Sequence, residues 1–119
     1  MPSTIIYDRG QVVVVNVPFS RGTGTKPRPA LIISDHSFHG TLPDVIVCPI
    51  SSHPHYHAKP GPGDCPIKAW HALSLRYAST VRVSKILCVD KKIIGRKLGT
   101  LAQADMAKVE SALRAALRL

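Results

Sequence analysis

An arginine between two prolines is the residue whose setting first suggests chemistry. Arg28 lies in the stretch KPRPALIIS, between Pro27 and Pro29 and directly before an apolar run. Each proline fixes its own φ, and Pro29 also restricts Arg28 to extended geometry, so the arginine loses little freedom when it binds an anion. A planar guanidinium donates several hydrogen bonds in an arrangement that fits a phosphate group. The alternative is an ordinary surface arginine at a loop-to-strand junction, and the local sequence weighs the two equally.

Two serines follow a second apolar run. Ser51 and Ser52 end the segment DVIVCPISS. If the two apolar runs pair as antiparallel strands, the end of one lies beside the start of the other, and Ser51 falls near Arg28. A hydroxyl and a guanidinium would then form a phosphate cradle, although small polar residues also simply end strands. The chain has no G-x-S-x-G motif, so no serine is predicted to be an acyl-transfer nucleophile.

A second arginine interrupts an alternating strand pattern. Arg82 lies in TVRVSKILCVD, residues 80–90, on the face opposite the valines. A cation in mid-strand needs either solvent or a partner. A phosphate ligand and an ion pair with Asp90 or Asp44 remain equal alternatives.

The segment HPHYH contains the obvious candidates for metal binding. His53, His55 and His57 alternate, and alternate histidines on one strand face could bind zinc or nickel. The surrounding segment is rich in proline and offers no carboxylate or cysteine at regular spacing, so a chance cluster in a basic loop is the favoured interpretation. The same loop could stack Tyr56 or a histidine on an RNA base, and a histidine could transfer protons near neutral pH.

Short strands and one closing helix must position these residues. The apolar patterns predict strands over residues 11–19, 30–34, 44–52 and 80–90. Residues 20–29 are expected to form a flexible basic loop, residues 53–66 a long surface loop, and residues 92–99 a turn broken by glycine.

The C-terminal segment has a helical pattern. From Leu101 onward an apolar stripe recurs every three to four residues, at Met106, Val109, Leu113 and Leu117. Thr100 and Gln103 are expected to form its capping box. The order of elements favours a small, strongly curved antiparallel sheet or barrel with a helix packed against it, in a single domain over residues 1–119.

Composition limits the partners of the chain. Its 119 residues are 45% apolar, which suffices for one core, and 16 Lys and Arg outnumber 7 Asp and Glu to give a net charge of +9. Such a surplus indicates a polyanionic partner, most often nucleic acid; a solubilising charge or a surface covered by an acidic protein are the alternatives. No stretch approaches the ~18 apolar residues of a membrane span, and the N-terminus lacks the pattern of a secretory signal.

Cysteine usage indicates a reducing compartment. Cys48, Cys65 and Cys88 are odd in number and widely spaced, and no C-x-x-C occurs. This suits reduced thiols acting as small hydrophobes in a cytosolic protein, and disfavours a zinc ribbon or a redox motif.

Taken together, several segments resemble the MazF/PemK family of toxin–antitoxin ribonucleases. The matching pieces are RGQVVVVNVPFS, KPRPALIIS, DVIVCPISS, VRVSKILCVDKKIIGRKLGTL and the terminal helix, in the family's order. They cover most of the chain, and residues 53–76 match least. The resemblance implies a compact SH3-like β-barrel with a C-terminal helix that acts as a homodimer in the cytoplasm.

The resemblance also implies an activity and its partners. Members cleave single-stranded RNA, usually mRNA, at a short sequence and without a metal or other cofactor, which inhibits growth. An antitoxin with an acidic, disordered tail would bind across the active groove. The rivals are a protein-binding toxin of the CcdB gyrase-poison type, which shares the barrel, and a decayed, non-catalytic RNA-binding barrel.

The family's functional residues map onto this sequence one by one. Arg28 matches the catalytic arginine of the R-P motif, and Ser51 matches the Thr or Ser after the Pro-X pair of the third strand. Arg82 falls where Kid-like members carry a second active arginine. Those members have an acid–base aspartate two positions later, where this chain has Ser84, so the general base stays unassigned. Expected to bind RNA are Lys26, Ser52 and His53, and His53 is also a candidate general base.

Overall fold

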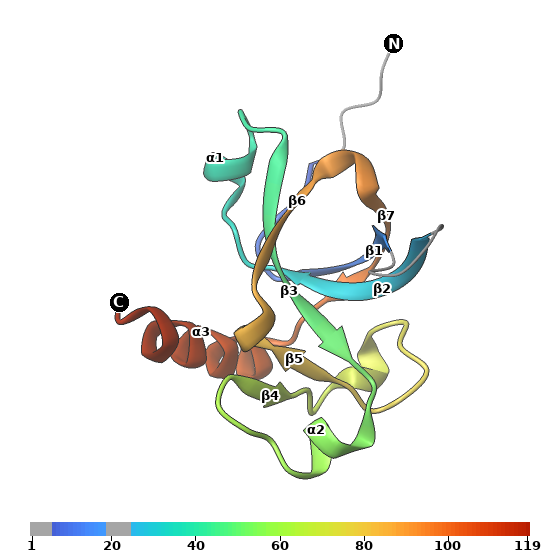
Figure 1. Ribbon diagram of the computed structural model, residues 1–119, viewed down its shortest axis with the longest axis vertical. Helices are drawn as coiled ribbons and strands as arrows, with labels where there is room; N and C mark the ends of the chain where they lie inside the picture. Colours follow the sequence, from blue (N-terminus) through green and yellow to red (C-terminus); the bar gives the residue numbers. More distant parts are fainter. Residues whose placement is uncertain (1–5, 19–24) are drawn as a thin grey trace.

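The computed structural model describes residues 6–18 and 25–119 of the chain, which form a bent antiparallel sheet and a C-terminal helix (Figure 1). The strands are β1 (Gln11–Pro18), β2 (Thr25–Ile32), β3 (Asp44–Ser51), β4 (Asp64–Pro66), β5 (Thr80–Arg82), β6 (Leu87–Asp90) and β7 (Ile94–Thr100). The α-helices are α1 (His36–His39), α2 (Pro54–Ala58) and α3 (Gln103–Leu117), and 3-10 turns span Trp70–Ala72, Val83–Lys85 and Lys91–Ile93. The predicted mainly β architecture with a closing helix is confirmed.

Strand β3 is the shared centre of the sheet. The strand order is β4-β5-β3-β2-β1-β7, and β6 pairs with the first half of β3. In the described part of the chain β4 and β7 do not pair, but the Ser74 amide donates to the Leu98 carbonyl of β7 over 3.2 Å. The segment between β4 and β5 therefore packs against the far strand, and the sheet curls into a barrel-like form.

The valine run of β1 packs on both faces of the sheet. Val12 packs in the core cluster that includes Val109 and Leu113 of α3, whereas Val13 and Val15 pack in a second cluster inside the bend of the sheet. Successive strand residues point to opposite faces. A strand covered on both sides therefore needs an unbroken apolar run rather than alternation.

Pro49 lies within β3, where a strand normally needs every amide. On one edge β3 pairs with β2. On the other edge residues 44–47 of β3 pair with β6, and Ile50 and Ser51 pair with β5. Pro49 falls in the gap between the two partners, where its missing N–H costs no ladder bond. Pro49 thus lies near the end of a central strand without breaking the sheet.

Helix α3 keeps its apolar stripe but not its expected cap. Val109 and Leu113 are buried, whereas Leu117 is 52% exposed. The predicted capping box is wrong, because the N-cap is Ala102 and makes no side-chain hydrogen bond. Instead the buried Asp105 carboxylate, in the first turn of α3, accepts the backbone amides of Lys68 and Ala69, each over 3.0 Å. A tertiary contact therefore anchors the start of the helix.

Three other predicted segments differ from the structure. Residues 92–99 do not form a simple turn, because most of them belong to β7. The expected loop 53–66 contains α2 and β4, and the expected strand 80–90 is broken by a 3-10 turn. In the expected loop 20–29 residues 25–29 belong to β2, and residues 20–24 lie outside the described residues. Short proline- and glycine-rich stretches take their conformation from their neighbours, which local patterns do not reveal.

Candidate functional site

Strand register brings Arg28 and Ser51 to one groove. β2 pairs with β3 from Ile32 opposite Val47 to Ala30 opposite Pro49, so Arg28 and Ser51 lie just beyond the paired residues at the same end of the two strands. Both residues line a groove of about 410 Å³, here called the Ser51 groove. Its walls are Lys26, Pro27, Arg28, Pro29, Ile50, Ser51, Ser52, His53 and Tyr56. The structure therefore brings together five of the six predicted site residues, all except Arg82.

The charge of Arg28 has no acidic neighbour in this groove. Its side chain is exposed and takes part in none of the ion pairs or side-chain hydrogen bonds of the described residues. All seven acidic residues of the chain lie in the described ranges, and none lines the Ser51 groove. Because β2 begins at Thr25, Arg28 lies on a strand opposite Val15 of β1 rather than in a loop. A guanidinium held this way is available to an anion from solvent.

The loop after Ser51 is held by local hydrogen bonds. The His53 amide donates to the Ser51 hydroxyl over 3.2 Å, and the His55 amide donates to His53 Nδ1 over 3.1 Å. His53 is thus the N-cap of α2, with Pro54 at the first helical position. A ring nitrogen that accepts an amide must be unprotonated, so neutral His53 carries its proton on Nε2. That tautomer makes His53 a hydrogen-bond donor to the groove and weakens its candidacy as a general base.

The other histidines of HPHYH diverge. His55 is exposed on α2, while His57 Nδ1 lies 3.2 Å from the Ser79 carbonyl. A helical turn does not put residues two apart on one face, unlike the strand on which a shared metal site would depend. Within residues 6–18 and 25–119 no three His, Cys, Asp or Glu residues cluster closely enough to hold a metal ion.

Arg82 lies behind the Ser51 groove rather than in it. Its Nε donates to Asp64 Oδ1 over 2.9 Å, so neither Asp90 nor Asp44 is its partner, and both of those pairings are wrong. The side chain of Asp64 is only 4% exposed and that of Arg82 20%. The hydrogen bond to Asp64 raises the pKa of Arg82, so the guanidinium stays charged. The Cζ atom of Arg82 lies 3.7 Å from the ring centroid of Tyr56, and Tyr56 lines the Ser51 groove.

A second groove adjoins the first across Arg28. This groove, here called the Arg96 groove, has a volume of about 610 Å³. Its walls are Val14, Pro27, Arg28, Pro29, Ser52, Ser74, Leu75, Arg76, Tyr77, Ser79, Arg96 and Leu98. Sequence reasoning missed Arg76, Tyr77 and Arg96. The only local signal was an arginine beside a tyrosine in the segment LRYAS, which is too common to single out.

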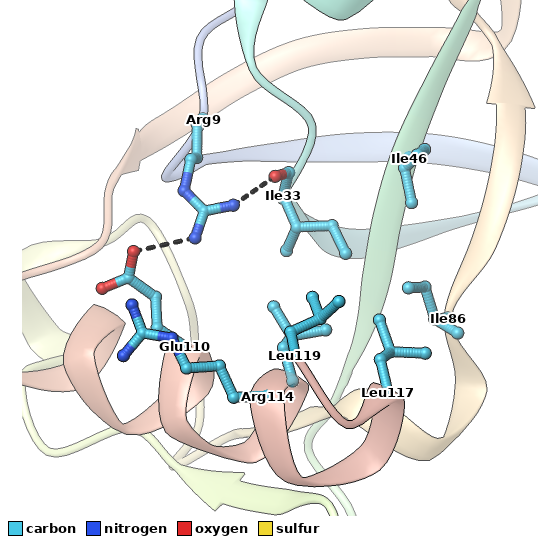
Figure 2. A pocket seen from close by; sticks show the side chains of 9 residues that line it. Arg9, Ile33, Ile46, Ile86, Glu110, Arg114, Leu117 and Leu119 are labelled. Carbon is cyan, nitrogen blue, oxygen red and sulfur yellow. Dashed lines mark hydrogen bonds and ion pairs between the residues drawn. The ribbon is translucent and has the colours of Figure 1, made fainter.

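A third groove, here called the α3 groove, lies between helix α3 and the sheet (Figure 2). It measures about 270 Å³, and its apolar walls come mainly from Ile33, Ile46, Ile86, Leu113, Leu117 and Leu119. At its mouth Arg9 donates to the Ile33 carbonyl and forms an ion pair with Glu110 over 2.8 Å. Of the two arginines that line this groove, Arg9 and Arg114, Arg9 is therefore already paired with an acid, unlike Arg28.

No helix in the part of the chain that the structure describes is long and apolar enough to cross a membrane.

Comparison with known families and structures gives a consistent picture. Residues 8–117 match the family model described as "PemK-like, MazF-like toxin of type II toxin-antitoxin system". No curated protein matches the chain in sequence.

Solved structures resemble the chain over nearly its whole length. MazE–MazF from Deinococcus radiodurans superposes with a TM-score of 0.77 and 22% identity over 97% of this chain and 99% of that one. An endoribonuclease in complex with its cognate antitoxin, from a mycobacterial species, superposes with a TM-score of 0.73 and 24% identity over 98% of this chain and 97% of that one. Mycobacterium tuberculosis toxin MazF-mt6 superposes with a TM-score of 0.69 and 20% identity over 90% of this chain and 97% of that one. At these identities the likeness establishes the fold, and it confirms the barrel with a C-terminal helix.

Proposed function

Because the chain belongs to the family of PemK-like, MazF-like toxins of type II toxin–antitoxin systems, we propose that it is a metal-independent endoribonuclease that cleaves single-stranded mRNA at a short sequence. The observation that carries this proposal is the Ser51 groove. It combines a proline-flanked arginine of β2, with no acidic residue in the groove, and a serine of the neighbouring strand β3. An anion with several oxygen atoms fits that arrangement.

The reaction needs no nucleophile from the protein. The ribose 2′-hydroxyl attacks the adjacent phosphorus, the P–O5′ bond breaks, and the 5′-oxygen leaves with a proton. The products are a 2′,3′-cyclic phosphate and a 5′-hydroxyl end. The protein has to align the attack and stabilise the extra negative charge on the non-bridging oxygens.

Arg28 is assigned the charge stabilisation. A donor that is held in place before the reaction and aimed at developing charge is worth about 3–4 kcal/mol of transition-state stabilisation. The flanking prolines supply that pre-organisation. No acidic residue lines the groove, so no carboxylate there neutralises the guanidinium of Arg28. Ser51 is assigned the positioning of a non-bridging oxygen, and Lys26, Ser52 and His53 are assigned contacts to the neighbouring nucleotides.

Arg82 remains the proposed second active arginine, in a role that its surroundings define. Its guanidinium bonds to Asp64 and stacks on Tyr56, so it acts on the groove through the position of the Tyr56 ring. Ser84, in the 3-10 turn after β5, supplies no carboxylate for acid–base work. No general base is assigned.

The proposed biological setting follows from the family. An antitoxin with an acidic, disordered tail covers the basic grooves. The toxin acts as a homodimer in the cytoplasm, and growth stops when the toxin is released from the antitoxin. A mycobacterial structural relative is named as an endoribonuclease with its cognate antitoxin, and the Deinococcus relative as a MazE–MazF pair. The surplus of 16 basic over 7 acidic residues suits both an RNA and an acidic tail.

Incubation of the purified protein with mixed-sequence single-stranded RNA in excess EDTA tests the proposal. We expect discrete fragments with 5′-hydroxyl ends, and no cutting where the ribose at the cut site is replaced by deoxyribose. Arg118→Ala, which removes an exposed charge at the end of α3, is the control expected to cleave normally. RNA that stays intact but bound would favour the decayed binding barrel, and DNA breaks in cells without RNA cuts would favour the gyrase poison. Cleavage of the deoxy substrate would exclude attack by the 2′-hydroxyl.

A further inference from the structure

We propose that the Arg96 groove is a second RNA subsite, which binds a nucleotide flanking the cut. Arg76 and Arg96 hold its phosphate, and Tyr77 stacks on its base. The inference rests on the proposed function, because it takes the same RNA strand to run through both grooves. It assigns binding residues that neither the family match nor the sequence motifs single out.

The two grooves are neighbours. They share the wall formed by residues 27–29 and the exposed side chain of Ser52. A phosphate seated at Arg28 therefore lies at the junction of both hollows. A strand whose phosphate is bound by Arg28 can therefore extend its next nucleotide toward the Arg96 groove.

Charge favours a polyanion in this groove. Arg28, Arg76 and Arg96 come from three different segments, are all exposed, and line one hollow in which no acidic residue takes part. None of the three forms an ion pair or a side-chain hydrogen bond within residues 6–18 and 25–119. By contrast, Arg9 and Arg82 each bond to a carboxylate. Three like charges with no counter-charge are the arrangement that a phosphate backbone neutralises.

A bulge in the sheet places Arg96 in the groove. Val13 of β1 pairs with Lys97 and Val15 pairs with Ile94, so Val14 alone stands opposite both Gly95 and Arg96. One extra residue on a strand bends it and redirects its side chains. Arg96 and Val14 both line the Arg96 groove as a result.

Tyr77 provides the stacking surface. Its side chain is 65% exposed, and it forms part of the wall between the Arg96 groove and a further hollow of about 410 Å³. That hollow is lined by Ser52, Pro54, His57, Ala58, Tyr77 and Ala78. An exposed tyrosine beside small apolar side chains offers a flat face to a nucleobase, and arginines on the other side meet the phosphate.

The segment that carries Arg76 and Tyr77 is tied down on both sides. The Ile67 amide donates to the Ser79 carbonyl over 2.9 Å, and the Ser74 amide donates to the Leu98 carbonyl of β7 over 3.2 Å. The Ser79 hydroxyl donates to the Tyr77 carbonyl over 2.8 Å. Pre-organisation of this kind lowers the ordering cost when the groove binds a strand.

Binding of an uncleavable strand tests the inference separately from cleavage. The probe is a mixed-sequence RNA of about ten nucleotides in which every ribose carries 2′-fluorine, so the attacking hydroxyl is absent. Fluorescence anisotropy measures its affinity over a range of salt concentrations. The test variant is Arg76→Ala/Arg96→Ala, and the matched control is Lys92→Ala/Arg118→Ala, which removes the same charge from residues outside all of these grooves.

The salt dependence gives the clearest readout. Each phosphate contact to a single strand contributes about 0.7 to the slope of log affinity against log salt. Because Arg76 and Arg96 are assigned to one phosphate, the test variant should lower the slope by about 0.7, and the control should leave it unchanged. Tyr77→Ala should weaken binding about fivefold or more, while Tyr77→Phe, which keeps the ring, should bind like the wild type.

Several outcomes would overturn the inference. Equal slopes for test and control variants would remove the arginines from the RNA path, as would a wild-type protein that fails to bind the probe. Variants that bind RNA normally but lose competition by polyglutamate would assign the groove to an acidic polypeptide instead. Binding that depends on the groove in a protein that cleaves no RNA would support the subsite while refuting the nuclease.

Discussion

Arg9 in the α3 groove and Arg28 in the Ser51 groove have different surroundings, and these surroundings give the two arginines different roles. In the α3 groove Arg9 bonds to Glu110 and to a backbone carbonyl above apolar walls (Figure 2). In the Ser51 groove Arg28 has no acidic neighbour and faces solvent beside two serines. An arginine whose charge is matched within the fold stabilises the fold, and an unmatched one in a concave site is available for a ligand. The presence of Glu110 beside Arg9, and of no acid in the groove of Arg28, therefore separates the roles of these two arginines.

Loss of Arg28 should have the largest effect on activity. We expect Arg28→Ala to lower the RNA cleavage rate about 10²–10³-fold, since one pre-set donor to developing charge is removed. The melting temperature should change by no more than about 3 °C, because the described side chains lose no hydrogen bond or ion pair with Arg28. Initial rates on the mixed-sequence RNA and a thermal melt measure the two quantities. An unchanged cleavage rate would remove Arg28 from the site and erase the distinction between the grooves.

Loss of Arg82 should affect the fold more than loss of Arg28. Arg82→Ala leaves the Asp64 carboxylate, which is 4% exposed, without its partner. Unpairing a fully buried charge costs about 3–5 kcal/mol, and because Arg82 itself is 20% exposed we expect about 2 kcal/mol. Urea unfolding measures this difference in free energy.

A double substitution separates the loss of the Arg82–Asp64 ion pair from the loss of the contact between Arg82 and Tyr56. Arg82→Ala/Asp64→Asn removes both charges and should recover part of the lost stability. Cleavage should stay reduced in both variants, because Tyr56 loses the guanidinium 3.7 Å from its ring centroid. Full cleavage activity in a folded Arg82→Ala protein would exclude Arg82 from any role in the reaction.

The core behind the α3 groove should respond to alkaline pH. Burial raises the pKa of the Cys48 thiol to about 12, above its ordinary value of 9.0. The folded state then holds this proton more tightly than the unfolded state, so the stabilisation is complete below pH 9.0 and is lost as pH rises toward about 12. Unfolding free energies of wild type and Cys48→Ala between those limits should show a shallower decline in the variant. Parallel curves would contradict this.

The smallest effect is expected at the ion pair of the α3 groove. The side chains of Arg9 and Glu110 are 36% and 39% exposed. Exposed pairs contribute about 0–1 kcal/mol, so Glu110→Gln should change the unfolding free energy by less than about 1 kcal/mol. RNA cleavage should be unaffected. A loss of cleavage comparable with that of Arg28→Ala would show that both grooves serve the reaction.

Local chemistry made part of the site predictable. The proline-flanked Arg28 and the strand-ending Ser51 were placed together from the antiparallel pairing of two apolar runs, and the structure has both in one groove. The buried valine run and the apolar stripe of α3 were also predictable, because burial demands an apolar pattern at the period of each element. The N-terminal cap of α3 was not predictable, because hydrogen bonds from the distant Lys68 and Ala69 amides to Asp105 take the place of a local capping box.

The sequence alone determined the class of fold, the basic character of the surface and the stiff setting of Arg28, since each depends on residue type, periodicity or the restraint of a neighbouring proline. Only the tertiary structure decided that Arg82 pairs with Asp64 and that Arg76, Tyr77 and Arg96 share a groove with Arg28. These residues come from segments far apart in the chain. Their meeting depends on strand order and on a bulge in β7. Such long-range pairings leave no periodic trace in a single sequence.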